Sequence, residues 1–256
     1  MGDSKLHKKL RKLRLGVSAG AVALGLSAVS AGANQVKVDW YSASPTFGDF
    51  NLPPCGTYDC GQVYDNSNPE VGPNLVGGVP VVSAANPAGL VEGAGNPLNW
   101  WTPSAGITFE GQTIAQLPIN QSMFVPEGTG SGDASTFQTA IFSATLHVGA
   151  GGGMITFGGD DDMFLALNGN VVDEVGGVHP SGPTSTFDVG PGTYAMEVFY
   201  ADRHVTDAVA NLQLSGDITT SVPEPSTWAM MAIGFTGLGY ASLKRGRKNR
   251  LAPAIA

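Results

Sequence analysis

Positive charge is scarce in most of this chain. Of its 13 Lys and Arg residues, only Lys37 and Arg203 lie between Asn34 and Val222, whereas that stretch holds 19 of the 21 Asp and Glu residues. Two positive against 19 negative side chains give this body a formal charge of −17, compared with −8 for the whole chain. A surface that binds nucleic acid needs cations to meet the phosphates, so nucleic acid is excluded as a partner. A strongly acidic body suits solubility and divalent cations.

Motifs of the common enzyme classes are also missing from this body. It has no HExxH zinc motif, no serine nucleophile elbow and no phosphate-binding loop. We therefore expect a protein that is not an enzyme. A pair of carboxylates for glycoside hydrolysis stays open as an alternative, because the separation that this reaction needs is spatial.

Sustained helical periodicity is absent as well. Gly, Pro, Asn, Ser and Thr interrupt short apolar runs throughout the body, which is typical of an all-β protein. We predict an antiparallel β-sandwich or jelly-roll-like domain over residues 34–215, with a flexible connection at 149–153. The predicted strands are 36–41, 140–148, 154–157, 163–167, 171–175, 184–189, 194–200 and 209–214.

Cysteine is nearly absent. The two cysteines, Cys55 and Cys60, lie in the run CGTYDC. In an oxidising compartment they are expected to form a disulfide that closes a small loop, worth about 2 kcal/mol by chain entropy. A zinc site needs more ligands than these two, and their spacing is not that of a CxxC redox motif.

Residues 1–33 predict a secretory signal peptide. Six cations precede an uncharged stretch at 15–29, and Ala31 and Ala33 fit a signal peptidase site just before Asn34. An uncleaved anchor is the alternative, but the uncharged stretch is shorter than the roughly 20 apolar residues that a membrane span needs. The body is therefore expected to be exported.

The other end of the chain predicts a membrane helix over 227–243. Residues 228–243 carry no charge, and five cations follow within the tail 244–256. A helix of this length falls short of a hydrocarbon core of about 30 Å, a deficit that flanking residues and local thinning can cover. The basic tail is expected to stay in the cytoplasm, which places the body outside.

The segment that precedes this helix contains Pro223, Glu224 and Pro225. This tripeptide, an apolar span and a basic tail in that order resemble the PEP-CTERM sorting signal. The resemblance implies that an exosortase recognises the tripeptide and processes the tail. It further implies an inner-membrane intermediate, followed by release to the cell surface or extracellular matrix. Residues 216–226 are interpreted as a linker to the sorting segment.

Residues with chemical potential gather between Phe157 and His204. They lie in the runs FGGDDDMF from Phe157, LNGN from Leu167, DEVGGVH from Asp173 and FYADRH from Phe199. Asn-Gly between two apolar runs predicts a β-hairpin. Three consecutive aspartates repel one another, so they need solvent, backbone donors or a cation.

These runs resemble the fibro-slime domain, a relative of the lectin-like β-sandwich first known from anthrax protective antigen, over residues 140–215. In such lectin modules paired aspartates bind calcium, and calcium holds sugar hydroxyls. The resemblance implies that Asp161 and Asp162 form the pair, with Asp160 assisting. Calcium takes about 6–8 oxygens, so Asn168, a backbone carbonyl and water would complete the shell. A solvated turn is the alternative.

Arg203 is the only arginine of the body and lies among acidic residues. Its planar guanidinium favours a two-pronged carboxylate pair that lysine cannot match. We predict a buried or half-buried structural ion pair with one of five aspartates: Asp160, Asp161, Asp162, Asp173 or Asp202. Recognition of a sugar or carboxylate ligand by Arg203 is the alternative.

Four further residues are candidates for ligand binding. His179 and His204 suit a metal or an acid–base pair, although packing and hydrogen-bonding roles are commoner for such residues. Trp100 and Trp101 suit stacking on sugar rings. Neighbours on a strand point to opposite faces, so one of the two tryptophans at most is expected to line a site. The favoured hypothesis is a module that binds extracellular polysaccharide; a purely structural matrix protein and a glycan-active enzyme are the alternatives.

Overall fold

The computed structural model describes residues 34–50, 61–123, 136–179, 182–204 and 208–222. Several predictions lie outside these ranges: the signal peptide at 1–33, the disulfide of Cys55 with Cys60, the sorting motif at 223–225, the membrane helix at 227–243 and the basic tail. Within the described ranges, no helix has the length and hydropathy that a membrane crossing requires.

The described chain is built from antiparallel β-strands, which confirms the predicted fold class. A single 3-10 turn, η1 (Asn99–Trp101), is the helical element among the described residues. The strands are β1 (Gln35–Ala43), β2 (Ile107–Gln116), β3 (Ile119–Ser122), β4 (Phe137–Asp160), β5 (Asp162–Leu167), β6 (Asn170–Val175), β7 (Thr184–Val189), β8 (Gly192–Ala201) and β9 (Val209–Ser221). The sequence analysis missed β2 and β3. β2 is exposed along most of its length, so it lacks the alternation that marks a half-buried strand.

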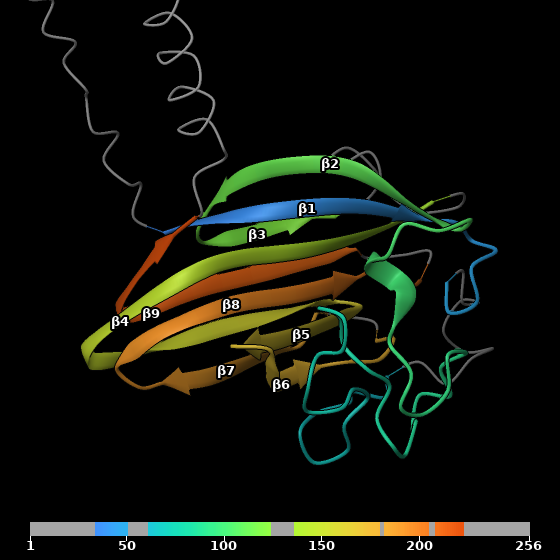
Figure 1. Ribbon diagram of the computed structural model, residues 1–256, viewed down its shortest axis with the longest axis horizontal. Coiled ribbons are helices and arrows are strands. Elements are labelled where there is room, and N and C mark those ends of the chain that lie inside the picture. The colour runs from blue at the N-terminus through green and yellow to red at the C-terminus, as the bar shows by residue number, and fades with distance from the viewer. Residues whose placement is uncertain (1–33, 51–60, 124–135, 180–181, 205–207, 223–256) are drawn as a thin grey trace, which may run out of the picture. The chain divides into compact units, whose positions relative to one another are not determined.

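The nine strands form one hydrogen-bonded sheet, and the long strand β4 contributes to both of its layers, called the first and second sheets here. In the first sheet, β4 pairs with β1 and β8 in the order β2-β1-β4-β8-β5-β6. In the second, residues 153–160 pair with β7 and β9, and residues 145–148 pair with β9 as well as with β8. Figure 1 shows β4 running beside β8 and β9 and turning at one end of the strands. The register of β4 with β9 shifts between Val148 and Gly153. The predicted flexible connection at 149–153 is therefore wrong: these glycines form an irregularity inside one continuous strand.

The irregularity changes which side chains of β4 face the core. Phe142 and Leu146 precede it and Ile155 and Phe157 follow it, and all four belong to one buried cluster. Side chains alternate along a regular strand, so even and odd positions meet the same core only because the register shifts between them. Both parts of β4 thus enclose one core, as the two sheets of a β-sandwich do. Fully burying such a side chain contributes about 1.5–3 kcal/mol.

Residues 61–106, called the cap here, cover the outer face of the first sheet. The cap follows the edge of β6: Tyr64 and Gly176 exchange two backbone hydrogen bonds, and Leu75 N–H donates to Gly169 C=O. A second apolar cluster joins the cap to Phe137, Phe164 and Phe199. Every residue of β5 is consequently buried, with the core on one side and the cap on the other. The blue-green cap lies beside β5 and β6 in Figure 1.

The predicted linker begins too early. β9 continues through Ser221, and its last residues pair with β4. Ile218 and Thr220 are buried, and the Thr220 hydroxyl donates to Gln35 C=O at 2.7 Å. Polar composition suggested a linker here, but alternate residues of the segment still face the core.

The close approach of β7 to β4 is testable at Gly158. A Cβ on this residue would lie 2.0 Å from the carbonyl oxygen of Pro183 and 2.7 Å from the Cα of Thr184. Gly158→Ala is expected to destabilise the fold by roughly 1–3 kcal/mol, because backbone atoms of β7 must move. Thermal melting measures the effect. Gly190→Ala is the control, since no atom lies within 4 Å of its added Cβ. Equal melting temperatures for the two variants would contradict the β4–β7 pairing.

Candidate functional site: a buried acidic cluster around Arg203

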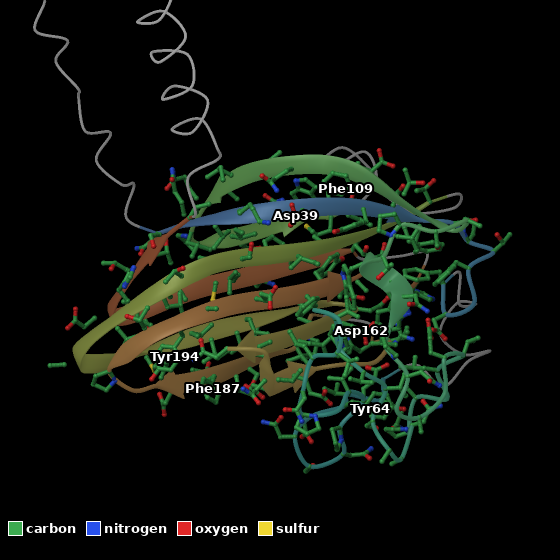
Figure 2. The ribbon with its side chains drawn as sticks, in the orientation of Figure 1. Asp39, Tyr64, Phe109, Asp162, Phe187 and Tyr194 are labelled. Carbon is green, nitrogen blue, oxygen red and sulfur yellow. The ribbon has the colours of Figure 1, made fainter. Side chains whose placement is uncertain are left out.

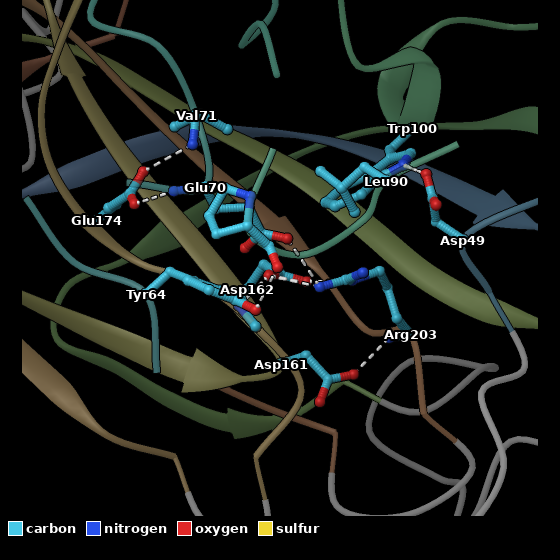
Figure 3. Close-up of polar contacts among 12 residues, drawn as sticks. Asp49, Tyr64, Glu70, Val71, Leu90, Trp100, Asp161, Asp162, Glu174 and Arg203 are labelled. Carbon is cyan, nitrogen blue, oxygen red and sulfur yellow. Dashed lines mark hydrogen bonds and ion pairs between the residues drawn. The ribbon is translucent and has the colours of Figure 1, made fainter. Parts of the chain in front are cut away.

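Five charged residues meet beneath the cap. Glu70 comes from the cap, Asp161 from the junction of β4 and β5, Asp162 from the start of β5, Glu174 from β6 and Arg203 from the segment after β8 (Figure 3). These five residues are called the Arg203 cluster. Each is at most 3% exposed. One positive side chain thus faces four carboxyl groups away from bulk water.

Arg203 makes the predicted two-pronged pair. Its Nε and Nη2 donate to the two carboxylate oxygens of Asp162, at 2.5 and 3.0 Å. Nη2 also donates to Glu70 Oε1 at 3.1 Å, and the backbone N–H of Arg203 donates to Asp161 Oδ2 at 2.6 Å. Glu70 was not among the predicted partners. It lies 133 residues away in the sequence, within a segment that carries no recognisable motif.

Two of the predicted ion-pair partners have other bonds. Asp173 accepts hydrogen bonds from Ser185 Oγ at 2.6 Å and Asn66 Nδ2 at 3.1 Å. Asp202 accepts from the backbone N–H of His204 at 3.2 Å. The salt bridges of Arg203 are formed with Asp162 and Glu70 instead.

Both tryptophans are structural. Trp100 and Trp101 are 0% and 2% exposed and lie in η1 rather than on a strand. Trp100 donates from Nε1 to Asp49 Oδ2 at 3.1 Å, and Trp101 from Nε1 to Tyr200 C=O at 2.9 Å. The guanidinium carbon of Arg203 lies 4.8 Å from the ring centroid of Trp100, a cation–π contact. The expected stacking of a tryptophan on a sugar ring is therefore not available in this structure.

The ion pair shifts the pKa of both partners toward their charged forms. Burial acts to lower the pKa of Arg203, but the carboxylates of Asp162 and Glu70 outweigh it and raise that pKa further above its ordinary value. Burial acts to raise the pKa of Asp162, yet Arg203 and a backbone donor hold it below the usual range. Asp162 and Arg203 are therefore both charged at neutral pH.

Asp161 is the less satisfied of the two central aspartates. Burial and the neighbouring Asp162 raise its pKa to about 6. Its Oδ1 meets no hydrogen-bond donor among the described residues, and its carboxyl group contacts that of Asp160. Two carboxyl groups in hydrogen-bond contact require a proton or a cation between them. This is the point in the cluster where a cation would relieve the excess of negative charge.

The remaining two carboxyl groups are also shifted toward the protonated state. Burial raises the pKa of Glu70 well above its ordinary value, and contact with Asp162 adds to this. Burial raises the pKa of Glu174 to about 7. Glu174 accepts the backbone N–H groups of Glu70 and Val71, at 2.6 and 3.2 Å, and so attaches the cap to β6.

Two glycines after β6 allow this packing. A Cβ at Gly176 would lie 2.2 Å from Glu70 Oε2, so no side chain fits there. Gly177 has φ +93 and donates its N–H to Asp162 Oδ1 at 2.5 Å. The Gly-Gly pair of the sequence motif therefore serves the close packing around Asp162.

The two histidines are buried beside the cluster, 3% exposed for His179 and 5% for His204. Burial lowers the pKa of His179, which also feels the charges of Asp162 and Arg203. Neither ring nitrogen of His179 has a hydrogen-bond partner in another described residue. The expected acid–base or metal role of the pair stays a prediction.

Asn168 is not brought to the aspartates. It lies in the turn after β5, and a strand rises about 3.3 Å per residue, so it is roughly 20 Å from Asp162 along the strand. Its Oδ1 accepts from the backbone N–H of Ala195 at 2.8 Å. Across the described part of the chain, no three His, Cys, Asp or Glu side chains are arranged as ligands of one metal ion. The predicted set of Asp160, Asp161, Asp162 and Asn168 therefore does not form one shell.

The chain is thus an all-β sandwich protein with a buried, hydrogen-bonded acidic cluster. Comparison with known families adds evidence on how the protein is sorted. Residues 221–248 match the PEP-CTERM protein-sorting motif. This motif marks an exported protein that is processed at the membrane, in agreement with the sequence analysis of that segment.

Other known proteins are more distantly similar. Protein psiC of Dictyostelium discoideum is 27% identical over 106 residues, which are 39% of this chain and 20% of that protein. The chain thus spans about a fifth of this curated relative. The PA14 sugar-binding domain from an RTX adhesin is 14% identical, with a TM-score of 0.32 over 73% of this chain and 90% of that one. The GH31 alpha-xylosidase of Xanthomonas citri is 15% identical, with a TM-score of 0.30 over 47% and 13%. At these TM-scores neither structure indicates what the chain binds.

The two-pronged pair can be tested with Arg203→Lys. Lysine keeps the charge but cannot hold both oxygens of Asp162 and reach Glu70 together. Breaking a buried pair costs roughly 3–5 kcal/mol, so the melting temperature should fall by several degrees or more. Lys37→Met is the control, because the pair of Lys37 with Asp39 is only half-buried and should contribute about 1 kcal/mol. An Arg203→Lys variant as stable as the control would contradict a structural role.

The buried carboxyl groups make stability depend on pH. The pKa of Glu174 is raised from 4.5 to about 7 in the folded chain, so folding favours its protonated form. The stabilisation is complete below pH 4.5 and is lost as the pH rises through 7, by roughly 3 kcal/mol. Melting temperatures between pH 4.5 and 8, in EDTA, measure this loss.

Glu174→Gln resembles the protonated carboxyl group at every pH, so its melting temperature should change less over that range. Glu110→Gln, on the exposed strand β2, is the matched control and should follow the wild-type curve. A Glu174→Gln curve as steep as that of the wild type would show that Glu174 does not titrate in this range.

Proposed function

We propose that this chain is an exosortase-sorted protein of the cell surface or extracellular matrix, and that its β-sandwich binds polysaccharide through calcium held at Asp160 and Asp161. The observation that carries the proposal is the carboxyl group of Asp161. It is fully buried, contacts another carboxyl group and has an oxygen without a donor among the described residues.

Export and sorting are supported by both ends of the chain. The motif match covers 221–248, and the uncharged stretch and cations after it suit processing by an exosortase in the inner membrane. Residues 1–33 suit removal by signal peptidase. The expected destination is the cell surface or the extracellular matrix.

Calcium suits the chemistry of the aspartates better than a transition metal. Carboxylate oxygens are the ligands that calcium prefers, at about 6–8 per ion. Asp162 is already committed to Arg203, so the pair that we assign is Asp160 with Asp161 rather than Asp161 with Asp162. Backbone carbonyls and enclosed water would supply the remaining oxygens, because Asp160 and Asp161 are 2% and 0% exposed.

Polysaccharide is the proposed ligand because of the resemblance of the 140–215 region to lectin-like modules, in which calcium bound by paired aspartates holds sugar hydroxyls. The composition agrees with this, because a body of charge −17 concentrates divalent cations at its surface. We propose binding without turnover, since the body carries none of the common catalytic motifs.

A structural protein without a ligand is the second candidate. The observation that favours it is the completeness of the bonds of Arg203 and Asp162, which tie the cap to the sheet and need no cation. In that case the cluster only stabilises the fold.

Calcium binding separates these candidates. The full chain, purified in detergent, should melt at a higher temperature in calcium than in EGTA, because calcium at 100 times its dissociation constant stabilises the folded state by about 2.7 kcal/mol. Asp161→Asn keeps the size of the side chain and an acceptor for Arg203 N–H, and it should abolish the shift. Glu110→Gln should keep it.

A pull-down with extracellular polysaccharide from a producing strain completes the test. Binding that is lost in EGTA and in Asp161→Asn supports the proposal. A melting temperature that calcium leaves unchanged, or that calcium raises equally in the wild type and in Asp161→Asn, would contradict the calcium site and favour the structural alternative.

A further inference from the structure

The other end of β5 carries a hollow that the Arg203 cluster does not use. It measures about 280 Å³ and lies between the β5–β6 turn and the β7–β8 turn. Leu167 and Val189, both nearly buried, line it at the bottom. Figure 2 shows Phe187 and Tyr194 at this end of the strands, away from Asp162. The hollow thus lies at the opposite end of β5 from the Arg203 cluster, and its lining includes buried apolar side chains.

Two aromatic side chains form the walls. Phe187 and Tyr194 are half-buried and pack against the main core, so each keeps one part in contact with the hollow. The Tyr194 hydroxyl donates to Gly190 C=O at 3.1 Å, which fixes the ring. Rings held in this way lose little conformational entropy when a ligand stacks on them.

The rim of the hollow is polar, and only some of its hydrogen-bonding atoms have a partner among the described residues. Asn168 uses its Oδ1 for the N–H of Ala195, and Asn170 uses its Nδ2 for the C=O of Asn168. No partner is found among the described residues for Asn168 Nδ2, Asn170 Oδ1 or the exposed carboxylate of Asp188. One amide donor, one amide acceptor and a carboxylate therefore surround the mouth of the hollow.

This combination matches the two sides of a sugar ring. The C–H face of a pyranose is apolar and suits the aromatic walls, whereas its hydroxyls suit amide and carboxylate partners. The volume is near the lower end of ligand pockets, about 300–1,000 Å³, which fits one sugar unit of a chain rather than a large ligand.

Charge narrows the class of sugar. Asp188 lies on the rim, and no Lys or Arg lines the hollow. The body that surrounds it has a formal charge of −17. A uronic acid or sulfated sugar would meet like charge there, which favours an uncharged sugar.

We infer that this hollow is a binding subsite for a neutral sugar unit of a polysaccharide, and that it works without calcium. The inference rests on the proposed function in naming polysaccharide as the ligand, but it assigns a second site and a sugar class. The polymer would contact the sandwich at the β7–β8 end, independently of Asp160 and Asp161.

The test is calorimetry or surface plasmon resonance with the full chain in detergent. The probes are hexasaccharides of glucose, mannose and galactose, with a galacturonic acid hexamer as the acidic counterpart, each in calcium and in EGTA. We expect at least one neutral hexamer to bind equally in both buffers and the acidic hexamer to bind more weakly. Asn170→Ala and Asp188→Ala should each weaken binding about fivefold or more, because each removes a hydrogen-bond partner of the sugar.

Both variants change exposed residues, so folding should be unaffected. Gln213→Ala, an exposed amide on β9, and Glu110→Ala, an exposed carboxylate on β2, are the matched controls and should bind as the wild type does. Tyr194→Phe keeps the ring but loses the hydrogen bond to Gly190 C=O that holds it, so it should weaken binding less than Asn170→Ala or Asp188→Ala does.

The outcomes distinguish the two proposals. Binding that requires calcium and Asp161 but ignores Asn170→Ala and Asp188→Ala would overturn the hollow and leave the proposed function intact. Binding that persists in EGTA and is weakened by the rim variants supports the hollow, whatever calcium does to the melting temperature. Stronger binding of the acidic hexamer would overturn the assignment to neutral sugars, and no binding of any probe would overturn the sugar subsite itself.

Discussion

The guanidinium of Arg203 is the contact on which the arrangement of this domain depends. It joins the start of β5 through Asp162 to the cap through Glu70, while its own backbone follows β8. Trp100 covers it, and Glu174 fixes the cap to β6 next to it. A single side chain therefore connects elements that lie far apart in the sequence, in a place where water does not compete for its hydrogen bonds.

Such a cluster is costly as well as useful. Each buried charge loses its hydration, and the carboxyl groups outnumber the arginine. The pKa values of these carboxyl groups therefore shift in different directions. Asp162 stays ionised against Arg203, whereas Glu70, Glu174 and Asp161 have raised pKa values. A proton or a cation must accompany them, so the stability of the fold is expected to depend on pH, and under the proposed function also on calcium.

Local sequence signals predicted most of the strands and the need for an arginine pair, because alternation, Asn-Gly turns and a lone arginine among acids are local features. The identity of the partner was not local. Glu70 contacts Arg203 only because the cap lies along β6, and no sequence pattern in residues 61–106 predicts that position of the cap. Trp100 and Trp101 were interpreted from an assumed strand, yet they lie in a 3-10 turn where both can be buried. The Gly149–Gly153 run was interpreted as a connection between two strands. It instead changes which side chains of β4 face the core, without ending the strand.

The cap gives the two ends of β5 different capacities. At Asp162 it adds an apolar cluster and a second set of hydrogen bonds, so side chains there are committed to one another. At Asn168 the contacts of the cap end with the backbone hydrogen bond from Leu75 to Gly169. The hollow between the β5–β6 turn and the β7–β8 turn lies beyond these contacts, and aromatic and amide groups line it. The end rich in charge is therefore suited to stability, and the end poor in charge keeps groups that are available to the neutral sugar proposed above. Under that proposal, the polymer is held without rearrangement of the core.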